Sequence, residues 1–83
     1  MFDKVLANSI LRFMIDKRSA VDAGIAQGLN EDQQRVAYHL EMIADKHPQN
    51  FKTEPFSDGR TRFISSNPQY CKDLLDNGGF LEA

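Results

Sequence analysis

The sequence predicts a mainly α-helical domain with a small β-hairpin, in the order helix, helix, helix, hairpin, helix. Apolar residues recur at three- and four-residue steps as far as residue 46, which is the spacing of helices with one buried face. From Phe51 the pattern changes to two short runs around Asp58-Gly59, a dipeptide suited to a tight hairpin turn. Asn67-Pro68 then starts a last helix, with the proline at its first position.

The first helix is expected from about Asp3 to Lys17. Its inward stripe consists of Phe2, Val5, Leu6, Ile10, Phe13 and Met14. Leu11 widens this stripe, which indicates a helix at the centre of the core or of a dimer contact.

The second helix is expected from about Ala20 to Gln27. Ser19 precedes it as a candidate N-cap, and Asp22 lies where its carboxylate can reach back to complete a capping box. The inward residues of this helix are Val21, Ile25 and Leu29. Only two residues separate it from the third helix, and so tight a connection predicts a steep crossing, as in a helix-turn-helix.

The third helix is expected to begin after Asn30, with Gln33 as the partner in a second capping box. Glu31 and Asp32 are then placed in the first turn, where acids favour the positive end of the helix dipole. The helix is expected to continue to about residue 46. Its inner stripe is Val36, Leu40 and Ile43, with Gln34, Tyr38 and Glu41 facing outward. His39 lies beside the inner stripe and is interpreted as a partly buried core histidine.

Phe51, Phe56, Phe63 and Ile64 supply the apolar side chains of the hairpin. Pro55 cannot donate a hydrogen bond within a sheet, so the first strand is expected at an edge or with a bulge. The last helix is expected to end at Asn77-Gly78-Gly79.

Two segments, IAQGLNEDQQRVAYHLEMIADK and FKTEPFSDGRTRFI, together resemble the winged helix-turn-helix domains of small bacterial transcription regulators, of the arsenical-repressor type and of the short fimbrial type. The matching residues are Ile25-Ala26 in the second helix, Val36, His39, Leu40 and Ile43 in the recognition helix, and Gly59-Arg60 at the wing tip. The resemblance covers about residues 5–65, and because the sequence has no repeat or linker we expect one winged helix domain over residues 1–83. Its helix-turn-helix covers about 20–46, its wing about 51–65 and its last helix about 68–77.

The sequence departs from those families on the outer face of the third helix. They place serine or threonine and arginine or lysine there, whereas this chain has Gln33, Gln34, Ala37, Tyr38 and Glu41. The segment ADKHPQNF also lacks the short glycine turn that leads into the wing.

The resemblance implies a transcription regulator that binds double-stranded DNA, with the third helix in the major groove and the wing on phosphates. The residues expected to bind nucleic acid are Gln33, Gln34, Arg35, Tyr38, Lys52, Arg60 and Arg62. Glutamine can form two hydrogen bonds with adenine, and arginine can do so with guanine. The wing has three cations against Glu54 and Asp58, a local balance of +1, adequate for one or two phosphate contacts.

Charge favours a second interpretation. The chain has a net charge of −2, and residues 30–46 hold four acids against two cations, also −2. Acids near phosphate oppose binding, since cations supply most of the affinity for DNA. The alternative is a winged helix protein-interaction module, an adaptor or inhibitor encoded by a phage or plasmid, that binds a protein partner through Gln34, Tyr38 and Glu41. Tyrosine is a frequent interface anchor.

Other classes find little support. The sequence has no nucleophile motif, phosphate loop or cysteine cluster, so we expect no enzyme, no cofactor and no metal site. Cys71 is interpreted as a small packing residue. No apolar run is long enough to span a membrane, so we expect no membrane partner. The N-terminus does not have the pattern of a signal peptide, so we expect a cytoplasmic protein. A homodimer stays open.

Overall fold

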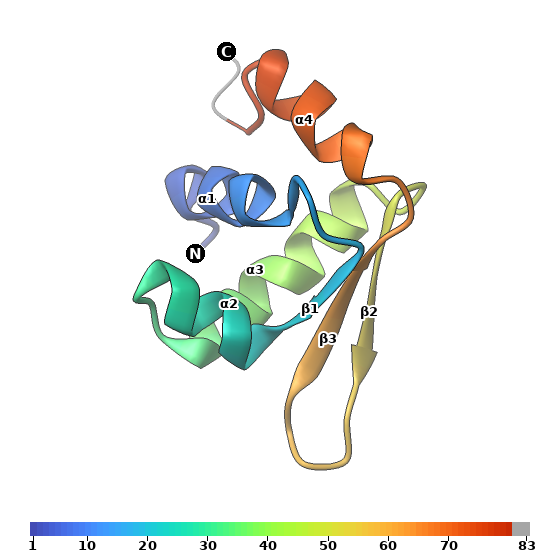
Figure 1. Cartoon of the computed structure of the whole chain (residues 1–83). Helices are drawn as coiled ribbons and strands as arrows, with labels where there is room; N and C mark the ends of the chain where they lie inside the picture. The colour runs from blue at the N-terminus through green and yellow to red at the C-terminus, as the bar shows by residue number, and fades with distance from the viewer. Residues whose placement is uncertain (81–83) are drawn as a thin grey trace.

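The structure, a computed structural model, describes residues 1–80, which form four helices and a three-stranded antiparallel sheet (Figure 1). Its elements are α1 (Lys4–Met14), β1 (Ser19–Val21), α2 (Asp22–Leu29), α3 (Gln33–Lys46), β2 (Phe51–Pro55), β3 (Thr61–Ser65) and α4 (Pro68–Asp76). The four helices and the hairpin were all predicted in this order. Strand β1 was not.

Helix α1 lies at the centre of the core, with α2, α3 and α4 all in contact with it. The largest fully buried apolar side chains are Ile10, Leu11, Met14, Ile25, Val36, Leu40, Ile43 and Phe63. The prediction that Leu11 widens the buried stripe of α1 is therefore confirmed. The inward assignment of Val5 was wrong, because the stripe begins one residue later, at Leu6, and leaves Val5 62% exposed.

Helix α1 ends at Met14, before the predicted Lys17, because the chain turns to reach the sheet. The amide of Lys17 donates to the carbonyl of Met14 at 3.0 Å, and the carbonyl of Arg18 accepts from the amide of Ser65 at 2.8 Å. Residues from Ser19 onward then pair with β3.

The N-cap role predicted for Ser19 was wrong. Ser19–Val21 forms the short strand β1, which pairs antiparallel with β3 so that Ala20 lies opposite Phe63. Helix α2 therefore begins at Asp22 without a side-chain cap. Three residues are too few for the alternation that marks a strand in a sequence.

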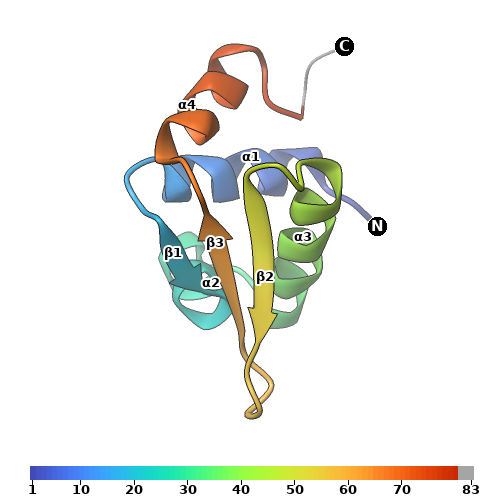
Figure 2. The ribbon, with the colours of Figure 1, turned by 90° about the vertical axis from the view of Figure 1, so that its right-hand side faces the viewer.

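The sheet has the order β1-β3-β2, so β2 lies at an edge, as the position of Pro55 predicted (Figure 2). Strand β2 pairs with β3 from Phe51 opposite Ser65 to Pro55 opposite Thr61. Gly59 has a φ of 89°, a left-handed conformation that glycine adopts without steric cost, which confirms the predicted turn. The hairpin runs beside α3 and extends beyond the helices (Figures 1 and 2).

The prediction of a capping box formed by Asn30 and Gln33 was wrong. Asn30 ends α2 in the left-handed region, at φ 56° and ψ 50°, a conformation that asparagine tolerates better than most residues. Asp32 caps α3 instead and accepts from the amide of Arg35 at 3.0 Å. Glu31 and Asp32 thus lie before the first turn of α3, not within it.

Two buried asparagines tie the outlying segments to the core. The side-chain oxygen of Asn8 accepts from the amide of Phe80 at 2.9 Å. Asn50 donates to the hydroxyl of Ser65 at 3.1 Å and accepts from the amide of Asn67 at 2.8 Å. These bonds fix both ends of α4, which packs against α1. Cys71 is buried on this helix, as its interpretation as a packing residue predicted.

Candidate nucleic-acid interface

Helix α3 separates its side chains as predicted. Val36, Leu40 and Ile43 are fully buried, while Gln34, Tyr38 and Glu41 are exposed on the opposite side. Asp45 follows Glu41 by four residues and shares its side of the helix. We call these four exposed residues (Gln34, Tyr38, Glu41 and Asp45) the outer face of α3. This face, which lies wholly within residues 1–80, contains two carboxylates and no cation.

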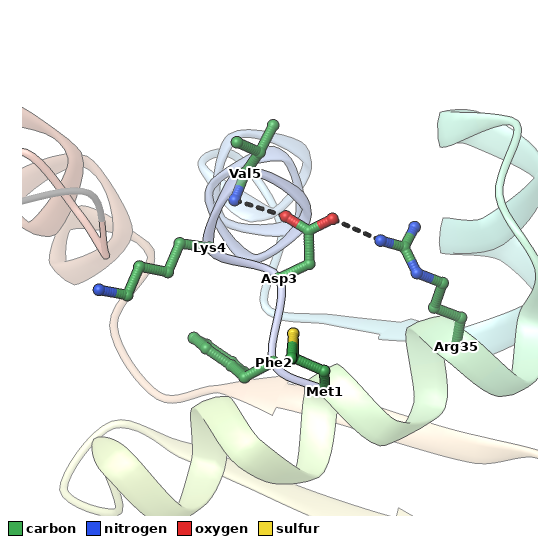
Figure 3. A pocket seen from close by; sticks show the side chains of 6 residues that line it. All are labelled: Met1, Phe2, Asp3, Lys4, Val5 and Arg35. Atoms are coloured by element: carbon green, nitrogen blue, oxygen red, sulfur yellow. Dashed lines mark hydrogen bonds and ion pairs between the residues drawn. The ribbon is translucent and has the colours of Figure 1, made fainter.

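Arg35, predicted to bind DNA, lies beside the outer face and forms two ion pairs. Its guanidinium contacts the carboxylates of Glu31, at 2.7 Å, and Asp3 (Figure 3). Glu31 and then Asp3 hold the pKa of Arg35 above its ordinary value. The pKa of Asp3 is lowered, first by the backbone amide of Leu6 and also by Arg35. The positive charge of Arg35 is thus balanced within the protein.

His39 is buried, as predicted, and it holds the N-terminal segment. Its Nε2 accepts from the amide of Asp3 at 2.8 Å, and its Nδ1 lies 2.7 Å from the carbonyl of Arg35. An atom that accepts from an amide carries no proton, and one beside a carbonyl must donate, so this geometry requires a neutral ring protonated at Nδ1. The ring of Phe2 stacks on His39 with centroids 5.4 Å apart.

The other cation of α3 faces the same segment. The ammonium of Lys46 lies 5.1 Å from the centroid of the Phe2 ring, within the range of a cation–π interaction. Arg35, His39 and Lys46 follow one another at spacings of four and seven residues, which places them along one side of the helix. We call these three residues the covered flank of α3.

Gln33, also predicted to bind DNA, makes a structural contact. Its side-chain amide donates to the carboxylate of Asp22 at 3.3 Å, and Asp22 is 1% exposed. The same carboxylate oxygen accepts from the amide of Ala23 at 2.7 Å. Gln33 therefore helps to satisfy a buried acid between α2 and α3 rather than completing a cap.

The hairpin groups two of its predicted residues around an aromatic ring. The guanidinium carbons of Arg60 and Arg62 lie 5.7 and 5.4 Å from the centroid of Phe56. Arg60 also pairs with Asp58 at 2.8 Å, which lowers the pKa of that carboxyl. Arg62 forms no ion pair with any of residues 1–80, and Lys52 approaches Glu54 at 3.9 Å. Sequence reasoning assigned the arginines to the site but assigned Phe56, four and six residues before them, only to the apolar side chains of the hairpin.

A hollow of about 580 Å³ lies at the start of α1, lined by Met1, Phe2, Asp3, Lys4, Val5 and Arg35 (Figure 3). Sequence reasoning did not find this region, because Asp3 and Arg35 are 32 residues apart and no local pattern links them. Among residues 1–80 there is no cluster of three side chains suited to a metal ion, and no helix is long and apolar enough to cross a membrane.

Comparison with family models, with curated proteins and with solved structures found no match.

Proposed function

We propose that the chain is a winged helix domain that binds duplex DNA as a cytoplasmic transcription regulator. The hairpin β2–β3 would be its wing, and α2 and α3 its helix-turn-helix. In this arrangement α3 lies along the major groove and the wing contacts the phosphate backbone.

The observation that carries the proposal is the pair of arginines on the Phe56 ring. The hairpin extends beyond the helices (Figure 2). It carries Arg60 and Arg62, both within cation–π distance of that ring. A ring that restrains a guanidinium lowers the entropy lost when it binds, and arginine matches phosphate in two-point geometry. Arg60 would exchange Asp58 for phosphate at little cost, because exposed ion pairs contribute little free energy.

In this proposal α3 contributes base contacts rather than charge. Gln34 and Tyr38 are exposed on its outer face, where a glutamine amide can bind adenine and a tyrosine can contact phosphate or a thymine methyl group. Lys52 supplies a further phosphate contact at the edge strand. Gln33 and Arg35 would first have to leave Asp22, Asp3 and Glu31.

The test is a titration of a random pool of duplex DNA with wild-type protein and with an Arg60→Ala, Arg62→Ala double variant. Two lost phosphate contacts should reduce the slope of log affinity against log salt by about 1.8. A matched control, Arg12→Ala with Lys72→Ala, removes two exposed cations on α1 and α4 and should leave the slope nearly unchanged. Absence of binding at low salt would contradict the proposal.

One observation favours a second candidate function, protein recognition through the outer face of α3. That face presents Glu41 and Asp45 beside Tyr38, which is 44% exposed, and so suits a basic protein surface. A Tyr38→Ala variant should then lose a partner that wild type retains from nuclease-treated lysate. Gln69→Ala, an exposed change on α4, should keep it; equal recovery by both variants would exclude this candidate.

A further inference from the structure

We infer that Phe2 and Asp3 form a removable cover over a second phosphate-binding site, the covered flank of α3. This inference rests on the proposed DNA binding and adds a regulation to it. The two cations of the flank, Arg35 and Lys46, are both occupied by the N-terminal segment: Arg35 by the carboxylate of Asp3 and Lys46 by the ring of Phe2.

The flank suits a strand of phosphates once the cover leaves. Arg35 and Lys46 lie on the same side of α3, eleven residues and therefore about 16 Å apart along its axis. They border the outer face that the proposal places in the groove, so they would face one wall of that groove. Freeing both cations from the N-terminal segment would offset the two carboxylates of the outer face, Glu41 and Asp45.

The contacts that close the cover are ones a polyanion can replace. The Asp3–Arg35 pair is exposed, with 38% and 41% of the two side chains accessible, so each gains little from the other in water. The two carboxylate oxygens of Asp3 have different partners. One accepts from the amides of Val5 and Leu6, and the other contacts Arg35 (Figure 3). Arg35 can therefore turn to a phosphate while Asp3 continues to cap α1.

Other contacts hold the cover in its place when no ligand is bound. The amide of Asp3 donates to His39, and the ring of Phe2 lies between His39 and Phe80, with centroids 5.4 Å from each. The cover is thus fixed by the buried His39 of α3 and the half-buried Phe80 after α4, while its contacts to the two cations lie at the surface.

The first variant that tests the cover is Asp3→Asn, which keeps a capping oxygen for α1 and removes one of the two carboxylates that pair with Arg35, leaving Glu31 in place. In duplex binding its salt slope should be steeper than that of wild type by about 0.9, one further phosphate contact. The matched control is Asp76→Asn, which also removes an acid from an exposed pair and releases a cation, Lys72, but on α4. Equal slopes for the two variants would overturn the inference.

A second variant, Phe2→Leu, keeps an apolar side chain but removes the ring beneath Lys46. It should steepen the slope by a similar amount, and Asp3→Asn with Phe2→Leu by about 1.8. A slope unchanged in Phe2→Leu and in the double variant would contradict a cover that acts on both cations.

Failure of the proposed function gives a different pattern. If Arg60→Ala with Arg62→Ala binds as wild type does, the wing proposal fails, and the comparison of Asp3→Asn with Asp76→Asn still decides the cover. If no form binds duplex, the NMR signal of the Arg35 side-chain N–H decides it. On addition of inorganic phosphate that signal should shift more in Asp3→Asn than in Asp76→Asn; an equal response in the two variants overturns the cover.

Discussion

The end of the molecule where α1 meets α4 and the end where the hairpin turns hold their polar groups in opposite ways. Near α4, Asn8 and Asn50 are 3% and 4% exposed and bond to backbone and side-chain groups far away in the sequence. At the hairpin, Arg60 and Asp58 pair across two residues with half of each side chain exposed. Buried polar groups are costly to leave unpaired, whereas exposed pairs exchange partners cheaply. The first end therefore maintains the fold, and the second is free to bind a ligand.

The largest effect is expected from Asn50→Ala. The change leaves the amide of Asn67 and the hydroxyl of Ser65 without the partner that joins β2 to the start of α4. The loss of both bonds from the buried Asn50 should lower the free energy of unfolding by about 3 kcal/mol, measured by urea denaturation. The control is Gln49→Ala, an exposed neighbour. A loss equal to that of the control would remove the distinction between the two ends.

Glycine substitutions sharpen the comparison, because each end has a glycine at positive φ. Gly59→Ala at the hairpin meets open space, so only the backbone conformation opposes it, by about 1–2 kcal/mol. At Gly79 a Cβ would also collide with the buried side chain of Asn8, so Gly79→Ala should be the more destabilising.

Gly24→Ala is the control for the glycine pair. Gly24 lies within α2, in an ordinary helical conformation and with open space where a Cβ would be. Because alanine is more stable than glycine inside a helix, the substitution should raise the free energy of unfolding by about 0.5–1 kcal/mol. Urea unfolding of all three variants measures the series. Equal losses of unfolding free energy at Gly59 and Gly79 would show that the Asn8 side chain moves away from the new Cβ without destabilising the fold.

A smaller effect concerns pH and His47. Burial, and then the positive charge of Lys46, lowers the pKa of His47 below its ordinary value of 6.5. The unfolded chain therefore binds more protons near this pH, so stability should fall as pH decreases through about 6.5 and level off below the folded pKa. In His47→Asn this part of the decline, measured by urea unfolding between about pH 7.5 and 5.5, should disappear. An unchanged profile in His47→Asn would show that a group other than His47 causes the decline.

Features that depend on residues close in the sequence were predicted, and features that depend on distant residues were not. The inner stripe of α3 and the Asp58-Gly59 turn depend on neighbours in sequence and were predicted, and with them the exposure of Gln34, Tyr38 and Glu41. Strand β1 owes its existence to β3, more than forty residues away, and was missed.

Site residues show the same limit. The type of Arg35 and its place on α3 follow from the sequence, but its pairing with Asp3 depends on the path of the N-terminal segment. Asn30 was misassigned for a related reason. Asparagine is favoured both before a helix and after one, and the length of α2, set by packing, decides between the two.

The smallest stability change, and the sharpest test of the two ends, is expected from Asp58→Asn. Asparagine keeps an oxygen that can accept from the amide of Arg60, a bond of 3.1 Å in the hairpin turn, and loses only the charge that pairs with the guanidinium. The free energy of unfolding should therefore change little, because an exposed ion pair contributes little to stability. The released Arg60 should nevertheless steepen the salt dependence of duplex binding, because less of its charge is balanced within the protein. A large loss of stability would show that the ion pair maintains the hairpin. In that case the wing would share the structural role of the α4 end, and its arginines would no longer be free to bind phosphate.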